Sequence, residues 1–117
     1  MQIWRHDEVA TPGGTRSPVV LYSGEEGRVI LVGFEPGQEL GDHEVREHAL
    51  LVPVAGFVDV VTAEQTIRAE PGTLVRLERA ERRAIRSPSG ARVLLVLAPW
   101  PGPGHYGPGE LTAARGV

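Results

Sequence analysis

Glycine and proline residues divide this chain into short runs of Val, Leu and Ile, and this spacing constrains its fold more than any other feature. Pro36-Gly37, Gly56 and Pro71-Gly72 each stand between two such runs. Short apolar runs joined by tight turns are typical of β-sheet proteins, and no long segment has apolar residues at helical spacing. The sequence therefore predicts an all-β barrel.

The apolar runs predict a series of short strands at close spacing. They are Gln2–Val9 at an edge, Val19–Ser23, Arg28–Glu35, His48–Ala55, Phe57–Thr62, Gln65–Ala69, Leu74–Leu77, Arg83–Ser87 and Ala91–Ala98. The segment Glu78–Arg86 contains good helix formers but lacks an apolar stripe, so we interpret it as a charged turn that leads into a strand. We expect residues 1–99 to form one barrel domain and the Gly/Pro-rich residues 100–117 to form an irregular tail.

Some of these strands are apolar on both faces, which affects both the core and the assembly. The runs Leu50–Val54 and Val93–Leu97 are of this kind. Because a barrel wall that faces solvent does not need a second apolar face, we expect a homodimer. We expect most of the buried lining to come from Leu31, Phe34, Leu51, Phe57, Val60, Leu74, Leu94 and Val96.

Composition excludes several functional classes. The chain has no cysteine, and therefore no disulfide, thiolate nucleophile or sulfur metal ligand. All twelve basic residues are Arg; residues 1–60 carry four of them against ten Asp or Glu, and residues 61–117 carry eight against five. A net charge of −3 with 5% aromatic residues argues against nucleic-acid binding.

Nothing in the sequence pattern directs the chain to a membrane or to export. Its N-terminus, MQIWRHDEV, carries charge where a signal peptide needs an apolar run. The longest apolar stretch, Val93–Pro99, is far too short to cross a bilayer. We therefore expect a soluble, cytoplasmic protein with no membrane partner.

Gly37, His43 and Gly56 have the spacing of a known metal-binding motif. That motif runs glycine, five residues, His-x-His, three or four residues, Glu, six residues and glycine. On this pattern, and on a second one that begins at Gly72, the stretch from about Gly27 to Leu97 resembles a small single-domain cupin. The resemblance implies an RmlC-like double-stranded β-helix, which is a jelly-roll barrel.

The second motif of that family runs glycine, five residues, Pro-x-Gly, two residues, His, three residues and Asn. Gly72 matches its first position. Glu78-Arg79-Ala80 replaces Pro-x-Gly, Arg83 replaces the His, and Ser87 replaces the Asn.

The metal ligands that the resemblance implies are mostly replaced in this chain. Val45 stands at the second His, Ala49 at the Glu and Arg83 at the third His, so that only His43 remains of four ligands. One imidazole does not hold Zn, Mn, Fe or Cu with useful affinity, and a guanidinium repels a cation. We therefore expect a barrel without a metal cofactor.

The side chains expected at the barrel mouth form a polar cluster of His43, Glu47 and Arg83. This cluster predicts a pocket for a small anionic or polar ligand, in which Arg83 makes a bidentate contact and His43 donates or accepts a proton. The alternative is that Glu44, Glu47 or Glu81 neutralises Arg83 and that the barrel has no ligand site.

A metal site is a further alternative, in which His43 and Glu47 bind a divalent transition metal. On a continuous strand their even spacing places both side chains on one face, and a bulge in the strand would also allow them to converge. His48 would then face the opposite side, so His43 and His48 are not expected to bind one metal together.

Two functions from different classes fit this pattern. One is a non-enzymatic module that binds or senses a small molecule and lacks the usual metal. The other is a small enzyme, either metal-dependent through His43 and Glu47 or a metal-free isomerase or lyase with His43 as base and Arg83 as electrostatic stabiliser.

Overall fold

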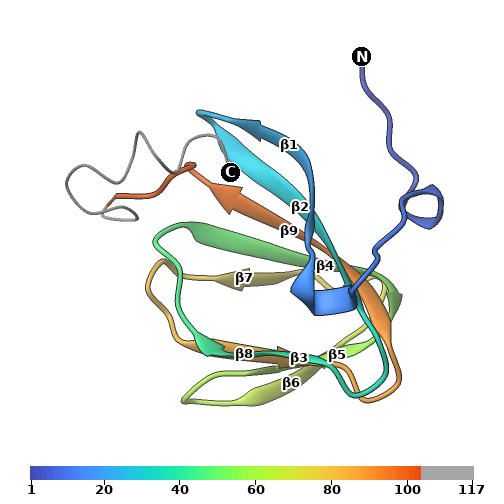
Figure 1. The fold of residues 1–117 in the computed structure, drawn as a ribbon. Coiled ribbons are helices and arrows are strands. Elements are labelled where there is room, and N and C mark those ends of the chain that lie inside the picture. The colour runs from blue at the N-terminus through green and yellow to red at the C-terminus, as the bar shows by residue number, and fades with distance from the viewer. Residues whose placement is uncertain (104–117) are drawn as a thin grey trace.

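The computed structural model describes residues 1–103, and these residues form two antiparallel β-sheets that face each other (Figure 1). Their strands are β1 (Val19–Gly24), β2 (Gly27–Phe34), β3 (Glu39–His43), β4 (His48–Gly56), β5 (Val58–Val61), β6 (Thr66–Ala69), β7 (Val75–Leu77), β8 (Arg83–Arg86) and β9 (Ala91–Ala98). One sheet has the order β1-β2-β9-β4-β7 and the other the order β3-β8-β5-β6. The predicted all-β architecture is confirmed.

The core lies between the two sheets because alternate residues of each strand point inward. Strand β9 is central in the five-stranded sheet and pairs with β2 on one side and β4 on the other. The inward side chains of both sheets form one apolar cluster. Its buried members are Val32, Phe34, Ala49, Leu51, Val58, Val60, Ala69, Leu77, Ile85, Ala91, Val93, Leu95 and Leu97.

Two of the strand assignments from sequence differ from the structure. Strand β3, with the sequence ELGDH, was not expected because it contains a single large apolar residue, and it exists through its pairing with β8. The expected strand Gln2–Val9 is wrong: His6–Glu8 forms the 3-10 turn η1, and a second turn, η2, spans Gly14–Arg16.

The N-terminal segment crosses the outside of the five-stranded sheet instead of extending its edge. The Arg92 guanidinium donates hydrogen bonds to the carbonyl oxygens of His6 and Val9, and to Thr11 Oγ1 at 3.1 Å. These carbonyl groups are therefore satisfied by a side chain and not by a neighbouring strand. Trp4 and Val9 line a small apolar cavity over the outer face of the sheet.

The expected core is half right, and the two errors in β9 follow from the apolar residues on both of its faces. Phe34, Leu51 and Val60 lie in the core, and Leu31 is fully buried but on the outer face, beneath the N-terminal segment. In β9 the core face is the alternate one, since Val93, Leu95 and Leu97 are buried whereas Leu94 and Val96 are half-buried. Leu74 is 63% exposed, and Phe57 is half-buried, with the Arg68 guanidinium 4.0 Å from its ring centroid.

The expected irregular tail falls largely on residues 104–117, which lie outside the described residues. Residues 99–103 contain no strand or helix. Residues 1–103 also include no apolar helix of membrane-spanning length.

Candidate functional site

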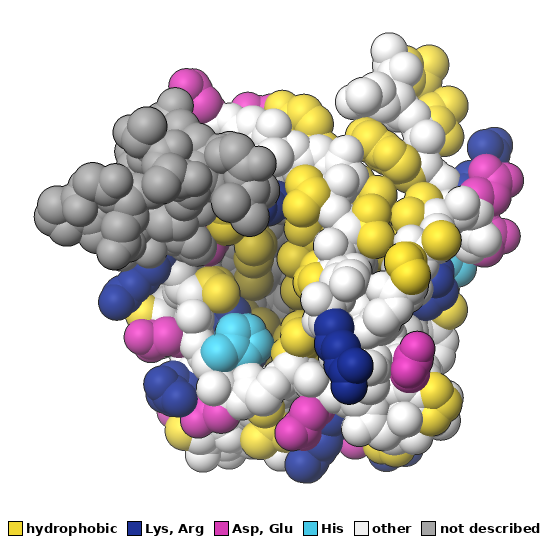
Figure 2. Space-filling model, in the orientation of Figure 1, with side chains coloured by type: hydrophobic (Ala, Val, Ile, Leu, Met, Phe, Trp, Pro, Cys, Tyr) yellow, Lys and Arg dark blue, Asp and Glu magenta, His cyan; other side chains and the backbone are white. Residues whose placement is uncertain are grey.

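A cavity of about 130 Å³ lies between the two sheets. Its lining consists of apolar side chains and two polar ones, His43 and Arg83. Both polar residues come from the four-stranded sheet, where His43 of β3 pairs directly with Arg83 of β8. A hollow lined by hydrophobic side chains opens between the sheets on the face shown in Figure 2.

The four positions at which the sequence motifs place metal ligands come together in this cavity. His43, Val45, Ala49 and Arg83 all line it. In the turn of the second motif, Ala80 stands at the place of the motif glycine and has a φ of +63°. This left-handed conformation is one that glycine adopts easily and alanine does not. The fold therefore retains the geometry of the site, although the ligand side chains have changed.

The side chains at these positions do not fit a metal ion. A divalent transition metal needs several imidazole or carboxylate donors that converge on it, whereas this cavity offers one imidazole, one guanidinium and apolar side chains. Residues 1–103 contain no group of three or more His, Asp or Glu side chains placed to hold a metal. The chemistry of this cavity therefore has to come from His43 and Arg83.

Glu47 does not line the cavity with His43 and Arg83. His43 ends β3 and His48 begins β4, so the even-spacing argument for one continuous strand does not apply to this loop. Glu47 is fully buried, and its Oε2 accepts a hydrogen bond from the Gly102 backbone N–H at 2.6 Å. Glu47 therefore ties the start of β4 to the segment that follows β9.

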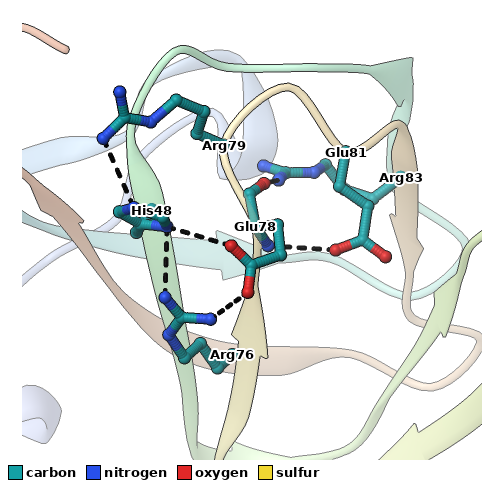
Figure 3. Close-up of polar contacts among 6 residues, drawn as sticks. All are labelled: His48, Arg76, Glu78, Arg79, Glu81 and Arg83. Carbon is teal, nitrogen blue, oxygen red and sulfur yellow. Dashed lines mark hydrogen bonds and ion pairs between the residues drawn. The ribbon is translucent and has the colours of Figure 1, made fainter.

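Arg83 is the unusual group of the cavity, because its charged side chain is only 3% exposed. One Nη donates to the Glu78 carbonyl oxygen at 3.1 Å (Figure 3), and Nε is buried with no hydrogen-bond partner among residues 1–103. Burial lowers the pKa of the Arg83 guanidinium, and the charges of Glu81, Glu44 and Glu47 oppose this shift.

Among the described residues, no carboxylate lies within the 4 Å of Arg83 that an ion pair requires. The expected neutralisation by Glu44, Glu47 or Glu81 is therefore an attraction over a longer range. It is not a salt bridge.

His43 has a defined tautomer. Its Nδ1 lies 2.6 Å from the Gly41 carbonyl oxygen. Because a carbonyl oxygen only accepts hydrogen bonds, Nδ1 carries the proton, and Nε2 of the neutral ring keeps a lone pair. The ring can therefore accept one hydrogen bond, or one proton, from a ligand near Arg83.

His48 belongs to a separate network on the outside of the barrel (Figure 3). Its Nδ1 lies 3.4 Å from a Glu78 carboxylate oxygen, and its Nε2 lies 3.4 Å from an Arg79 Nη. An Arg76 Nη also lies 3.3 Å from Nδ1, so His48 contacts two guanidinium groups and one carboxylate. Arg76 completes the network with an ion pair to Glu78. His48 is thus engaged on the opposite side of β4 from the cavity.

Sequence reasoning missed much of the apolar lining. Leu40 lies on β3, which was not expected to be a strand, and Leu95 and Leu97 were not among the residues expected in the buried lining. The motif spacing could have predicted part of this lining. Val45 and Ala49 stand at positions where the motif places metal ligands, and both line the cavity.

The sequence matches no protein-family model and no curated protein. Solved structures resemble it closely in fold. A protein of Thermus thermophilus has a TM-score of 0.74 at 23% identity, over 85% of this chain and 98% of that one. An RmlC-like cupin protein from Desulfovibrio desulfuricans has a TM-score of 0.69 at 18% identity, over 84% and 98% of the two chains. A cupin superfamily protein from Desulfitobacterium hafniense has a TM-score of 0.69 at 15% identity, over 78% and 82%. With its two facing antiparallel sheets, this chain therefore has the small-cupin fold, a double-stranded β-helix.

Proposed function

We propose that this protein binds a small anionic molecule in the barrel cavity without a metal, and that it acts as a binding or sensing module. The observation that supports this proposal is the Arg83 guanidinium, which is buried in an apolar cavity with no carboxylate of the described residues within ion-pair distance. A buried charge without a close partner is costly. A bound anion supplies the missing charge and accepts the unused N–H groups.

His43 supports the same proposal from the neighbouring strand. Directly paired residues of antiparallel strands place their Cβ atoms about 4.5–5.5 Å apart on one face of the sheet. A ligand held by Arg83 therefore lies within reach of His43. We expect Arg83 to contribute more to binding, because a guanidinium offers a charge and two parallel donors whereas the neutral ring offers one hydrogen bond.

Thermal unfolding with acetate and inorganic phosphate tests the proposal. A ligand that binds only the folded state raises Tm, and at about one hundred times its Kd it adds about 2.7 kcal/mol to the free energy of unfolding. Arg83→Ala should abolish the shift, His43→Ala should reduce it, and Arg82→Ala should leave it unchanged. An unaltered shift in Arg83→Ala would refute the site.

Elemental analysis of untagged protein tests the metal-dependent alternative. We expect less than stoichiometric zinc, iron, manganese and copper. A stoichiometric metal that is lost in His43→Ala would show that the cavity is a metal centre and would overturn the anion site.

A metal-free enzyme is the second candidate, and the tautomer of His43 favours it. With Nδ1 hydrogen-bonded to Gly41, the lone pair on Nε2 can take a proton from a carbon next to a carboxylate held by Arg83. Exchange of that proton with D₂O, followed by NMR, would detect the step. If the exchange is no faster than in protein-free solution, the protein binds the carboxylate but does not remove its proton.

We also propose that two copies of the chain associate through the outer face of the five-stranded sheet. Leu50 and Val96 form a cross-strand pair on this face beside Val52, and all three are half-buried; Leu94, which pairs with Val52, lines the cavity beneath the N-terminal segment. Light scattering should give about twice 12.6 kDa, and Val96→Glu should halve that mass. Leu74→Glu, at an exposed position, serves as control. A monomeric mass for the unaltered protein would reject the dimer.

A further inference from the structure

The two walls of the cavity differ in chemistry. Its polar groups, His43 and Arg83, both lie on the four-stranded sheet. The lining residues from the opposite, five-stranded sheet are all apolar: Ile30, Val32, Ala49, Leu77, Leu95 and Leu97. A ligand that spans the cavity therefore meets one charged group at one end and aliphatic side chains along the rest of its length.

The charged wall fits a single carboxylate. Arg83 has a buried Nε–H with no hydrogen-bond partner in the described part of the chain, and a planar carboxylate can accept this N–H together with a neighbouring Nη–H. Within the described part of the chain, the cavity lining contains no second cation. A second carboxylate on the ligand would therefore be buried against the apolar wall without a partner, which is strongly unfavourable.

The cavity volume limits the apolar part of the ligand. An apolar cavity of about 150 Å³ in another protein holds benzene, which has six non-hydrogen atoms. The cavity of about 130 Å³ in this barrel has room for a slightly smaller group. With its carboxylate, butanoate has six non-hydrogen atoms and fills about that space, and longer chains exceed it.

We infer that the ligand is an aliphatic monocarboxylate of about three or four carbons, an inference that rests on the anion site proposed above. The carboxylate is held by Arg83 and His43, and the aliphatic chain lies against the residues of β2, β4 and β9 that face them. Chain length and the number of charges, more than hydroxyl groups on the ligand, determine selectivity at this site.

A chain-length series measured by calorimetry tests the inference. The probes are acetate, propionate, butanoate, pentanoate, hexanoate and octanoate, with succinate as the dicarboxylate and inorganic phosphate as the anion without an apolar part. Each added CH₂ should tighten Kd about fourfold until the cavity is full. Hexanoate and octanoate should bind more weakly than butanoate, and succinate should bind at least tenfold more weakly than butanoate.

Two variants connect the series to the structure. Arg83→Met keeps a long apolar side chain and removes the charge, and it should weaken butanoate binding at least tenfold. Arg82→Met makes the same change at the neighbouring, exposed position and should leave Kd within twofold. Ala49→Val narrows the apolar wall and should shift the preferred length to a shorter chain. Circular dichroism of each variant confirms that it folds.

The outcomes separate the two proposals. If phosphate and acetate bind through Arg83 but affinity does not rise with chain length, the anion site stands and the aliphatic ligand class is wrong. If succinate binds as tightly as butanoate, the single-charge argument is wrong. If none of the probes binds, both the ligand class and the anion site are wrong.

Discussion

Arg82 and Arg83 are neighbours in sequence but occupy opposite environments. The Arg82 side chain is 61% exposed, and its Nε and one Nη donate to an Asp42 carboxylate oxygen at 3.3 and 2.9 Å. That partner raises the pKa of Arg82, whereas burial lowers the pKa of Arg83. Because Arg83 begins β8 and successive residues of a strand point to opposite faces, one guanidinium lies in solvent and the other in the cavity.

The difference shows which charges of this barrel can serve a function. An exposed ion pair such as Arg82–Asp42 contributes little to stability, and water or salt replaces either partner. A buried guanidinium without a close carboxylate costs stability until a ligand neutralises it. Inward and outward positions should therefore respond differently to the same substitution, and four predictions test this difference.

The largest effect is expected at the apolar core. Leu51 is fully buried and faces inward, so Leu51→Ala should lower the free energy of unfolding by about 2–5 kcal/mol. Leu74→Ala, at a position that is 63% exposed, should change it by less than about 0.5 kcal/mol. Urea unfolding measures both. Similar losses in the two variants would contradict the observed strand register.

The next effect is a gain in stability at the proposed site. Arg83→Met replaces a buried charge with an apolar side chain of similar length, and the free protein should become more stable by about 1–4 kcal/mol. This variant should also lose its response to acetate and phosphate. Arg82→Met is the control and should leave Tm unchanged. A marked loss of stability in Arg83→Met would mean that its hydrogen bond to Glu78 is structural.

A smaller loss is expected at Ser87, which stands at the asparagine of the second motif. Its side chain is fully buried, and Oγ donates to the Phe57 carbonyl oxygen at 2.8 Å. Ser87→Ala should destabilise the fold by about 1–3 kcal/mol because the Phe57 carbonyl loses the hydrogen bond from this buried hydroxyl. Ser89→Ala, an exposed outward position, is the matched control. Equal effects in the two variants would show that the hydrogen bond contributes nothing.

The smallest effect is expected at Ala80, in the turn before β8. With a φ of +63°, Ala80 carries a backbone strain of about 1–2 kcal/mol. Glycine would relieve this strain, but it would also raise the conformational entropy of the unfolded chain, which offsets part of the gain. Ala80→Gly should therefore stabilise the protein by up to about 1 kcal/mol in thermal unfolding. Ala63→Gly, in an exposed turn without a positive φ, should be neutral or destabilising. Destabilisation by Ala80→Gly would count against the strained turn.

Sequence patterns were reliable where local chemistry decides the structure. Seven of the nine strands within residues 1–103 combine an apolar run with flanking glycine, proline or charged residues, and these were anticipated from Val19 onward, as was β8 after its charged turn. Strand β3 was missed because its backbone pairing with β8, not its side chains, makes it a strand. The prediction of an edge strand at Gln2–Val9 was wrong because alternation of apolar and polar residues does not by itself provide a neighbouring strand to pair with.

The candidate site shows the same division. Motif spacing alone placed His43 and Arg83 together and identified Val45 and Ala49 as apolar replacements for metal ligands. It did not place Glu47, whose carboxylate binds the Gly102 backbone N–H, since that contact joins residues far apart in the chain. The sequence by itself thus determined the barrel class and the loss of the metal donors, because residue type and local spacing decide both.

The tertiary structure alone decided which apolar face of β9 lies inside and that no carboxylate of the described residues pairs with Arg83. The first is undetermined by sequence because Val93 and Leu94 are equally apolar, so only packing against the opposite sheet distinguishes the two faces. The missing carboxylate partner of Arg83 within residues 1–103 depends on distances of a few ångströms between β8 and the acidic segments around it. The sequence shows that these segments carry opposite charge, but it does not show how far they lie from Arg83.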